Sequence, residues 1–318
     1  MFSALFVLAL ATLAYMISLN WFLPPVTMFQ LTDPADGSTI TQPVSLDHVD
    51  RDLLAAVLLH EDPELGTRAG PFDIGQFLDR VRIHVGGGDD PSGSTIPQQL
   101  VKNLFFTRDQ NALRKGLEAM LAFPFNAVVD DRRQLELYVN SAQFAPEVYG
   151  ICAASWYYFN TPPWDISGDQ AIALASLLPT ADFARRADGG GLDVSKTEGV
   201  VYRAWNRNTW YLPNQLAAVG GWPGITSTVG IDEPASAHAS RRNAPRRLLN
   251  HAPRPCGSDS QQKTPGGVSG FFAEPVGCKR FPAADRLSRW HPMVSLRSMS
   301  MRYPRRDLAA IQGIGHHR

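Results

Sequence analysis

Residues 97–106 read PQQLVKNLFF, and this stretch predicts an amphipathic helix within a mainly α-helical domain. Its apolar face is made by Leu100, Val101, Leu104 and Phe105. The polar side chains that project from the rest of the helix are Gln98, Gln99, Lys102 and Asn103. Pro97 is tolerated in the first turn, where a missing backbone N–H has no helical partner anyway.

Helical spacing of apolar residues predicts further helices on both sides of this stretch. They cover 47–60, 73–84, 111–122, 131–140, 170–178 and part of 199–219, and a loop rich in glycine and aspartate runs from Gly86 to Gly93. Pro124 is expected to kink or break the helix that begins at 111. No strand-like alternation of any length occurs, so the fold class is predicted to be mainly α.

The composition indicates a folded protein with two unlike parts. The chain has 318 residues, of which 44% are hydrophobic, enough to bury a core and too many for global disorder. Its formal net charge of zero is a sum, because residues 1–240 hold 15 basic and 26 acidic side chains, whereas residues 241–318 hold 15 basic and 4 acidic ones. Nucleic-acid binding needs a basic surface on a folded domain, and the part predicted to fold is acidic, so nucleic acid is excluded as a partner.

The N-terminal segment predicts a membrane anchor. Residues 2–19 carry no charge, and as a helix they reach about 27 Å, close to the roughly 30 Å hydrocarbon core of a bilayer. Trp21 and Phe22 suit the interface, and two prolines then stop the helix. A cleaved signal peptide is the alternative, but the apolar run exceeds the usual length and no small-x-small site follows closely. Residues 1–23 are therefore interpreted as a transmembrane anchor.

The remaining chain is divided by composition. Residues 24–46 are rich in proline and are interpreted as an extended linker. Residues 47–225 are interpreted as the folded domain. Residues 226–318 are rich in Arg, Pro, Ser and Gly without a sustained period, and are interpreted as a basic, disordered tail.

Two carboxylates stand out by their surroundings. Glu61 ends an apolar helix and enters a loop, and Glu118 lies among apolar residues beside Arg114 and Lys115. Each has an ordinary alternative: a solvated surface charge, or an i, i+4 salt bridge between Arg114 and Glu118 worth a few tenths of a kcal/mol. With Lys102, these groups would suit glycosyl transfer from a phosphate-linked donor, since the cations would counter the leaving phosphates and a glutamate would act as base.

Four motifs then occur in order. They are HED at 60–62, GSTIPQQLVKNLF at 93–105, LRKGLEA at 113–119 and ELYVN at 136–140. In this order the chain resembles the peptidoglycan glycosyltransferase family 51, especially its monofunctional biosynthetic branch, over about residues 45–225. The family's motifs read E-D-x-x-F-x-x-H-x-G-x-D, G-G-S-T-I-T-Q-Q-x-x-K-N, R-K-x-x-E, and a helix ending Y-L-N. Four ordered motifs are far more specific than one short pattern.

The chain fits the third of these motifs and departs from the other three. Leu65 stands for Phe and Arg68 for His in the first motif, Ser92 and Pro97 replace Gly and Thr in the second, and Val139 replaces Leu in the fourth. The principal catalytic positions are present, whereas the residues around them differ. A misplacement of about 1 Å can cost roughly 100-fold in rate, so reduced activity is one expectation.

The resemblance implies a lysozyme-like glycosyltransferase domain preceded by one N-terminal transmembrane helix. It implies that the enzyme polymerises lipid II into β-1,4-linked glycan strands and releases undecaprenyl diphosphate. Glu61 would be the general base that deprotonates the 4-hydroxyl of the acceptor sugar, and Glu118 the second essential glutamate, near the donor diphosphate. Lys102, Arg114 and Lys115 would offset the diphosphate charge. The residues that would hold sugar and phosphate oxygens are Ser94, Gln98, Gln99 and Asn103.

The resemblance also implies surroundings for the reaction. A divalent cation, Mg²⁺ or Mn²⁺, is expected at Glu118. The expected partners are lipid II, the growing glycan strand, the membrane, penicillin-binding transpeptidases and division proteins. The expected location is the bacterial cytoplasmic (inner) membrane, with a single-pass anchor and the domain on the periplasmic or outer face. Phe72, Ile74, Phe77, Leu78 and Val81 are either the family's amphipathic region beside the cleft or ordinary core.

Two alternatives stay open at this point. A lysozyme-like hydrolase or lytic transglycosylase would share the fold but cleave finished glycan, and such enzymes lack the Q-Q-x-x-K-N helix. A degenerate, inactive family member would act only as a scaffold for the cell-wall machinery.

Overall fold

The computed structural model describes residues 2–34, 39–85, 93–109 and 112–233. The glycine-rich loop predicted from Gly86 lies outside the described residues up to position 92. The predicted tail lies outside them from residue 234 onward.

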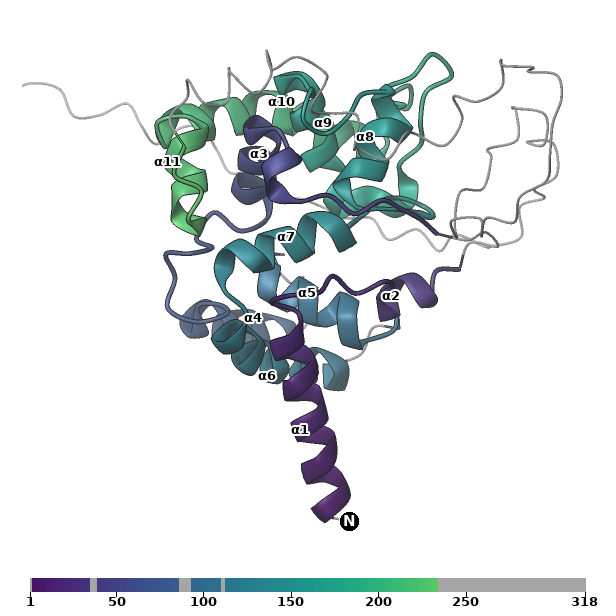
Figure 1. Ribbon diagram of the computed structural model, residues 1–318. Helices are drawn as coiled ribbons and strands as arrows, with labels where there is room; N and C mark the ends of the chain where they lie inside the picture. Colours follow the sequence, from purple (N-terminus) through teal and green to yellow (C-terminus); the bar gives the residue numbers. More distant parts are fainter. Residues whose placement is uncertain (1, 35–38, 86–92, 110–111, 234–318) are drawn as a thin grey trace, which may run out of the picture. The chain divides into compact units, whose positions relative to one another are not determined.

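The described residues are mainly helical, which confirms the predicted fold class (Figure 1). The longer helices are α1 (Phe2–Ser18), α3 (Arg51–Glu61), α4 (Ile74–Val85), α5 (Ile96–Phe105), α6 (Ala112–Val128), α7 (Asp131–Ser141), α8 (Ile151–Phe159), α9 (Gly168–Leu177) and α10 (Val200–Ala218). The shorter ones are α2 (Met28–Leu31), η1 (Leu46–His48), η2 (Leu178–Phe183), α11 (Trp222–Thr226) and η3 (Ser227–Val229). The strands are β1 (Ile40–Thr41), β2 (Gln143–Ala145) and β3 (Val148–Tyr149).

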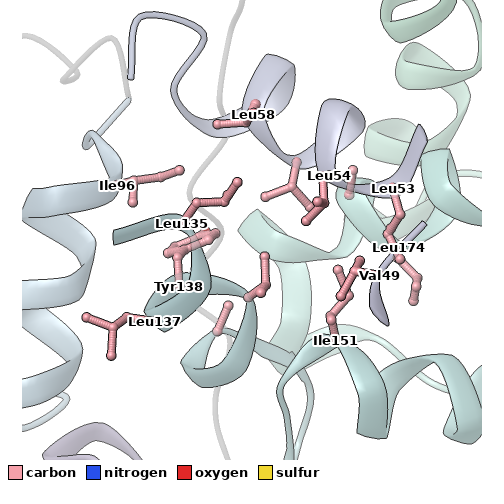
Figure 2. Packing of buried hydrophobic residues seen from close by; sticks show 14 of the residues in the cluster. Val49, Leu53, Leu54, Leu58, Ile96, Leu135, Leu137, Tyr138, Ile151 and Leu174 are labelled. Atoms are coloured by element: carbon pink, nitrogen blue, oxygen red, sulfur yellow. The ribbon is translucent and has the colours of Figure 1, made fainter. Parts of the chain in front are cut away.

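The apolar helix α3 forms the centre of the core. Leu53, Leu54 and Leu58 are completely buried, because α3 packs against α9, α10 and α11 (Figure 2). Burying one such side chain contributes about 1.5–3 kcal/mol. Leu135 and Tyr138 of α7 close the same core from another side (Figure 2). In Figure 1, α7 lies between this group and a second group made by α4, α5 and α6.

A kink or a break was predicted at Pro124, and the break does not occur. Helix α6 runs through this proline and ends at Val128. A proline inside a helix costs about 3 kcal/mol. Ala122 and Phe125, on either side of it, are completely buried, and α6 packs along α5. This packing offsets the lost backbone hydrogen bond, which a local sequence rule cannot weigh.

The segment 24–46, interpreted as an extended linker, contains ordered elements. Helix α2 packs against α5, and β1 joins a three-stranded sheet of order β1–β3–β2. Strand β1 pairs parallel with β3, whereas β2 pairs antiparallel with β3. The side-chain amide of Asn140 donates to Val44 O and accepts from Val44 N, both at 2.8 Å. These strands could not be predicted from alternating apolar and polar residues, because each is only two or three residues long.

Helix α1 projects from the second group and docks only at its C-terminal end (Figure 1). Met16 and Leu19 are buried, and Arg133 Nε donates to Leu19 O at 2.6 Å. Among the described helices, none combines the length and the apolar character needed to cross a membrane.

The folded unit reaches beyond the predicted boundary at residue 225. Arg51, whose side chain is 1% exposed, forms a two-pronged ion pair with Glu233: Nη2 lies 2.7 Å from Oε1 and Nε lies 3.2 Å from Oε2. Its Nη1 also donates to Leu46 O at 2.7 Å. Residues 226–233, interpreted as the start of the tail, therefore belong to the domain.

Removing the partner of a buried guanidinium is expected to be costly. We expect Glu233→Ala to lower the free energy of unfolding by about 2 kcal/mol, because the charge of Arg51 stays buried without a counterion. Chemical denaturation measures this effect. Asp232→Ala is the control, since Asp232 is an exposed carboxylate one residue away. Equal effects of the two substitutions would contradict the proposed role of the ion pair.

Candidate active site

Glu61 lies at the C-terminal end of α3 and is held by two neighbours. Its Oε1 lies 2.7 Å from His60 Nδ1, and its Oε2 accepts a 2.6 Å hydrogen bond from Gln99 Nε2. Burial by itself raises the pKa of Glu61. The hydrogen bond and charge of His60, with a further hydrogen bond from Gln99, outweigh it and bring the pKa below its ordinary value. The carboxylate is therefore ionised at neutral pH and aimed by fixed donors.

Gln99 of α5 is fixed on both sides of its amide. Its Nε2 also donates to Ser94 O at 2.9 Å, and its Oε1 accepts from the hydroxyl of Tyr138 at 3.1 Å. Tyr138 is completely enclosed, so burial, followed by the charge of Glu61, holds the pKa of its phenol well above the usual range. The tyrosine thus remains a neutral donor that orients Gln99, which in turn orients Glu61.

Glu118 of α6 is buried between two cations. Its side chain is 1% exposed, and its two oxygens lie 3.2 Å from Arg114 Nη1 and 3.2 Å from Lys115 Nζ. Hydrogen-bond geometry is not met at either contact, so the attraction is mainly electrostatic. This is more than the surface salt bridge that the spacing alone allowed, because a buried pair is screened far less by solvent.

The two glutamates belong to one connected polar network. Lys115 Nζ, beside Glu118, donates to Ser94 Oγ at 2.8 Å, and the carbonyl of Ser94 accepts from Gln99, beside Glu61. Lys102 faces the same region. Burial lowers the pKa of Lys102, the charges of Lys115 and Arg114 act in the same direction, and those of Glu118 and Glu61 oppose them. The structure thus gathers the predicted acidic and basic residues around one place.

Two of the predicted binding residues have different surroundings. Gln98 is buried, and its Oε1 accepts from the backbone N–H of Thr95 at 3.1 Å, which caps the start of α5. Asn103 is also buried, and its Oδ1 has no hydrogen-bond partner among the described residues. Gln98 therefore has a local structural role, whereas Asn103 retains an unused acceptor.

Arg68, a departure from the family motif, has a structural role that sequence reasoning missed. It binds both oxygens of Asp62, at 2.7 and 3.1 Å, and donates to the carbonyls of Gly70 and Pro71, both at 3.2 Å. Asp62 Oδ2 also accepts from the backbone N–H of Ile96 at 3.0 Å. This contact joins the end of α3 to the start of α5. The sequence did carry a signal for this pair: an arginine without an assigned role, Arg68, follows the HED motif closely.

The residues around Glu118 do not form a metal cage. Both of its oxygens face cations, and the described residues contain no group of three or more His, Cys, Asp or Glu side chains that could hold a metal. The Mg²⁺ or Mn²⁺ expected from the resemblance stays a prediction.

Comparisons with known proteins show which family the chain resembles. A model of the Transglycosylase family matches residues 30–196. The chain is 37% identical over 157 residues to a biosynthetic peptidoglycan transglycosylase of Shewanella frigidimarina, covering 49% of this chain and 68% of that relative. It is 33% identical over 201 residues to one of Rhizobium etli, covering 62% and 85%. For one of Agrobacterium fabrum the identity is 32% over 200 residues, covering 62% and 88%.

The Arg68–Asp62 pair is expected to stabilise the site. We expect Arg68→Ala to lower the free energy of unfolding by about 3 kcal/mol, because Asp62 would stay buried without its counterion. Arg82→Ala is the control: its ion pair with Asp79 is exposed, and its loss is expected to cost less than about 1 kcal/mol. Thermal or urea unfolding compares the two. A tolerated Arg68→Ala substitution would remove the role assigned to this pair.

Proposed function

The chain belongs to the transglycosylase family and is a peptidoglycan glycosyltransferase; on this premise we propose that it polymerises lipid II into β-1,4-linked glycan strands. The observation that carries the proposal is the polar network that connects an ionised, oriented Glu61, through Gln99 and Ser94, to the cations around Glu118. One side of the network can accept a proton, and the other can receive an anionic leaving group. These are the two requirements of glycosyl transfer from a diphosphate donor.

On the acceptor side, Glu61 takes the proton of the 4-hydroxyl of the incoming sugar. That oxygen then forms a bond to the anomeric carbon of the growing strand. The bond from this carbon to the diphosphate oxygen breaks, and its electron pair leaves with undecaprenyl diphosphate. Attack from the face opposite the leaving group inverts the anomeric carbon, so an α-linked donor gives a β linkage. His60 and Gln99 keep the carboxylate in place for this step.

On the donor side, Lys102, Arg114 and Lys115 stabilise the negative charge that develops on the leaving diphosphate. Preorganised charges of this kind are usually the largest contribution to catalysis. Glu118 keeps two of these cations close together in the resting enzyme, because its carboxylate lies between Arg114 and Lys115. Ser94, which accepts from Lys115, can bind an oxygen of the substrate beside it, and the unused acceptor of Asn103 can bind a sugar hydroxyl.

The membrane is the remaining part of the proposal, since both substrates carry long polyprenyl chains. We propose that α1 anchors the enzyme in the cytoplasmic membrane as a single pass, with the domain on its outer face. Backbone hydrogen bonds extend the turns of α1 as far as Phe22, and its first half exposes Leu5, Phe6, Val7 and Leu8.

Exposed apolar side chains on α4 and α6 support contact of the domain itself with the bilayer. They are Ile74, Leu78, Leu113, Leu117, Met120 and Phe123. The two helices meet through Phe72, whose ring lies 4.9 Å from that of Phe77 and 5.2 Å from that of Phe123. Of the predicted amphipathic residues, Phe72 is core, Ile74 and Leu78 are exposed, and the side chain of Val81 lies outside the described part. Transpeptidases and division proteins, as partners, rest on the family resemblance alone.

The base assignment has a direct test. We expect Glu61→Gln to reduce polymerisation of labelled lipid II by at least about 1,000-fold, because the amide cannot accept the proton. Glu64→Gln, an exposed carboxylate three residues away, is the control and should retain activity. Turnover of Glu61→Gln at the wild-type rate would disprove the assignment. Release of fragments from sacculi would instead favour a hydrolase, and a folded wild type without lipid II turnover would favour a scaffold.

The pH dependence tests the role of His60. Because the pKa of Glu61 is lowered, the acid limb of kcat/KM is expected below pH 4.5, the ordinary value for a glutamate. We expect His60→Ala to move this limb to higher pH, since burial then acts with less opposition. A pH profile of initial polymerisation rates measures the shift. An unchanged acid limb would separate His60 from the ionisation of Glu61.

A further inference from the structure

Phe29 of α2 lies under two cations of the α5 region. Lys102 Nζ is 5.1 Å from the centre of its ring, and Arg108 Cζ is 4.0 Å from it. Both distances are within the range in which the ring face attracts a cation. The family match begins one residue after Phe29, and the sequence motifs do not include it. The aromatic ring is therefore an addition to the site described above.

The two cations differ in their other contacts. Arg108 forms ion pairs with Asp33 at 3.0 Å and Asp182 at 3.3 Å, and it donates to Gln143. Lys102 makes no ion pair or hydrogen bond with any residue in the described ranges, although Glu118 and Glu61 act on it electrostatically. Arg108 is thus already neutralised, whereas the ammonium of Lys102 keeps its charge for an anion.

Helix α2 is built so that the ring has a fixed position. Thr27 N donates to Gln30 Oε1 at 2.7 Å, and Gln30 N donates to Thr27 Oγ1 at 3.2 Å, which together form a buried capping box. After the helix, Asp33 binds both Arg108 and the hydroxyl of Tyr149. The short helix is therefore tied down at both ends, and Phe29 lies between the ties.

From this geometry we propose that Phe29 is a positioning residue for glycosyl transfer, holding the ammonium of Lys102 in place for the donor diphosphate. The inference rests on the proposed function and adds α2 to the active site. A carboxylate in place of the ring would neutralise Lys102 and compete with the diphosphate. The face of a ring stabilises the charged form and leaves the charge available.

The ring opposes the effect of burial and of the neighbouring cations on Lys102, and it acts in the same direction as the acidic groups. Burial and the charges of Lys115 and Arg114 disfavour its protonated form and lower its pKa, whereas the acidic groups Glu118 and Glu61 favour it. Arg108, on the loop after α5, is the remaining cation at the ring. Loss of the aromatic face should therefore lower the pKa of Lys102 further.

The test compares Phe29→Leu with Phe29→Tyr in the full chain. We expect Phe29→Leu to lower kcat/KM for lipid II about tenfold, and Phe29→Tyr to retain it, because only the first removes the ring. The loss should fall mainly on kcat, since charge on the diphosphate develops in the transition state. The alkaline limb of the profile should move to lower pH. In a Lys102→Met background, Phe29→Leu should cause no further loss.

A second measurement keeps the inference separate from the proposed function. The pKa of Lys102, followed by the NMR signal of its side chain, should fall in Phe29→Leu and not in Phe29→Tyr. If this shift occurs while wild type fails to polymerise lipid II, the proposed function fails but the contact stands. If Phe29→Leu keeps both the wild-type rate and the wild-type pKa, the inference is overturned. Phe29→Met replaces Phe29→Leu if the latter does not fold by circular dichroism.

Discussion

The carboxylate of Asp62 is the contact on which the site depends, because it joins two helices that carry different halves of the chemistry. One oxygen binds Arg68, and the other binds Arg68 and the first N–H of α5. Helix α3 ends one residue earlier with Glu61, and α5 brings Gln99 and Lys102. Without this junction, Glu61 on α3 and Lys102 on α5 would lose one of the contacts that fix their relative position.

The electrostatics of the domain sharpen this division. Residues 1–240 carry more acidic than basic side chains, so a local concentration of positive charge needs a structural reason. Glu118 supplies one by holding Arg114 and Lys115, and Phe29 supplies another by facing Lys102. One device holds cations with a counterion, and the other holds a cation without neutralising it.

The long periodic segments could be predicted from the sequence, and the short or non-local features could not. Helices α3 and α5 lie close to their predicted ranges because each has an apolar face that repeats over three turns. Helix α2 was not predicted, because four residues are too few to show a helical repeat of apolar side chains. The continuation of α6 through Pro124 depends on packing between helices, which the local sequence does not contain. The role of Arg68 depends on its contact with Asp62, which only the folded structure shows.

The position of α3 also has a consequence for synthesis of the chain. This helix is made early, but its partners α9, α10 and α11 follow more than 100 residues later. Glu233, the ion-pair partner of Arg51, follows it by 182 residues. At roughly 5–20 residues per second, the ribosome needs about 10–40 s to deliver that last partner. For the early part of this interval Leu53, Leu54 and Leu58 of α3, which are completely buried in the fold, lack the helices that cover them. We therefore expect the nascent chain to need chaperones that cover this apolar segment until translation has passed residue 233.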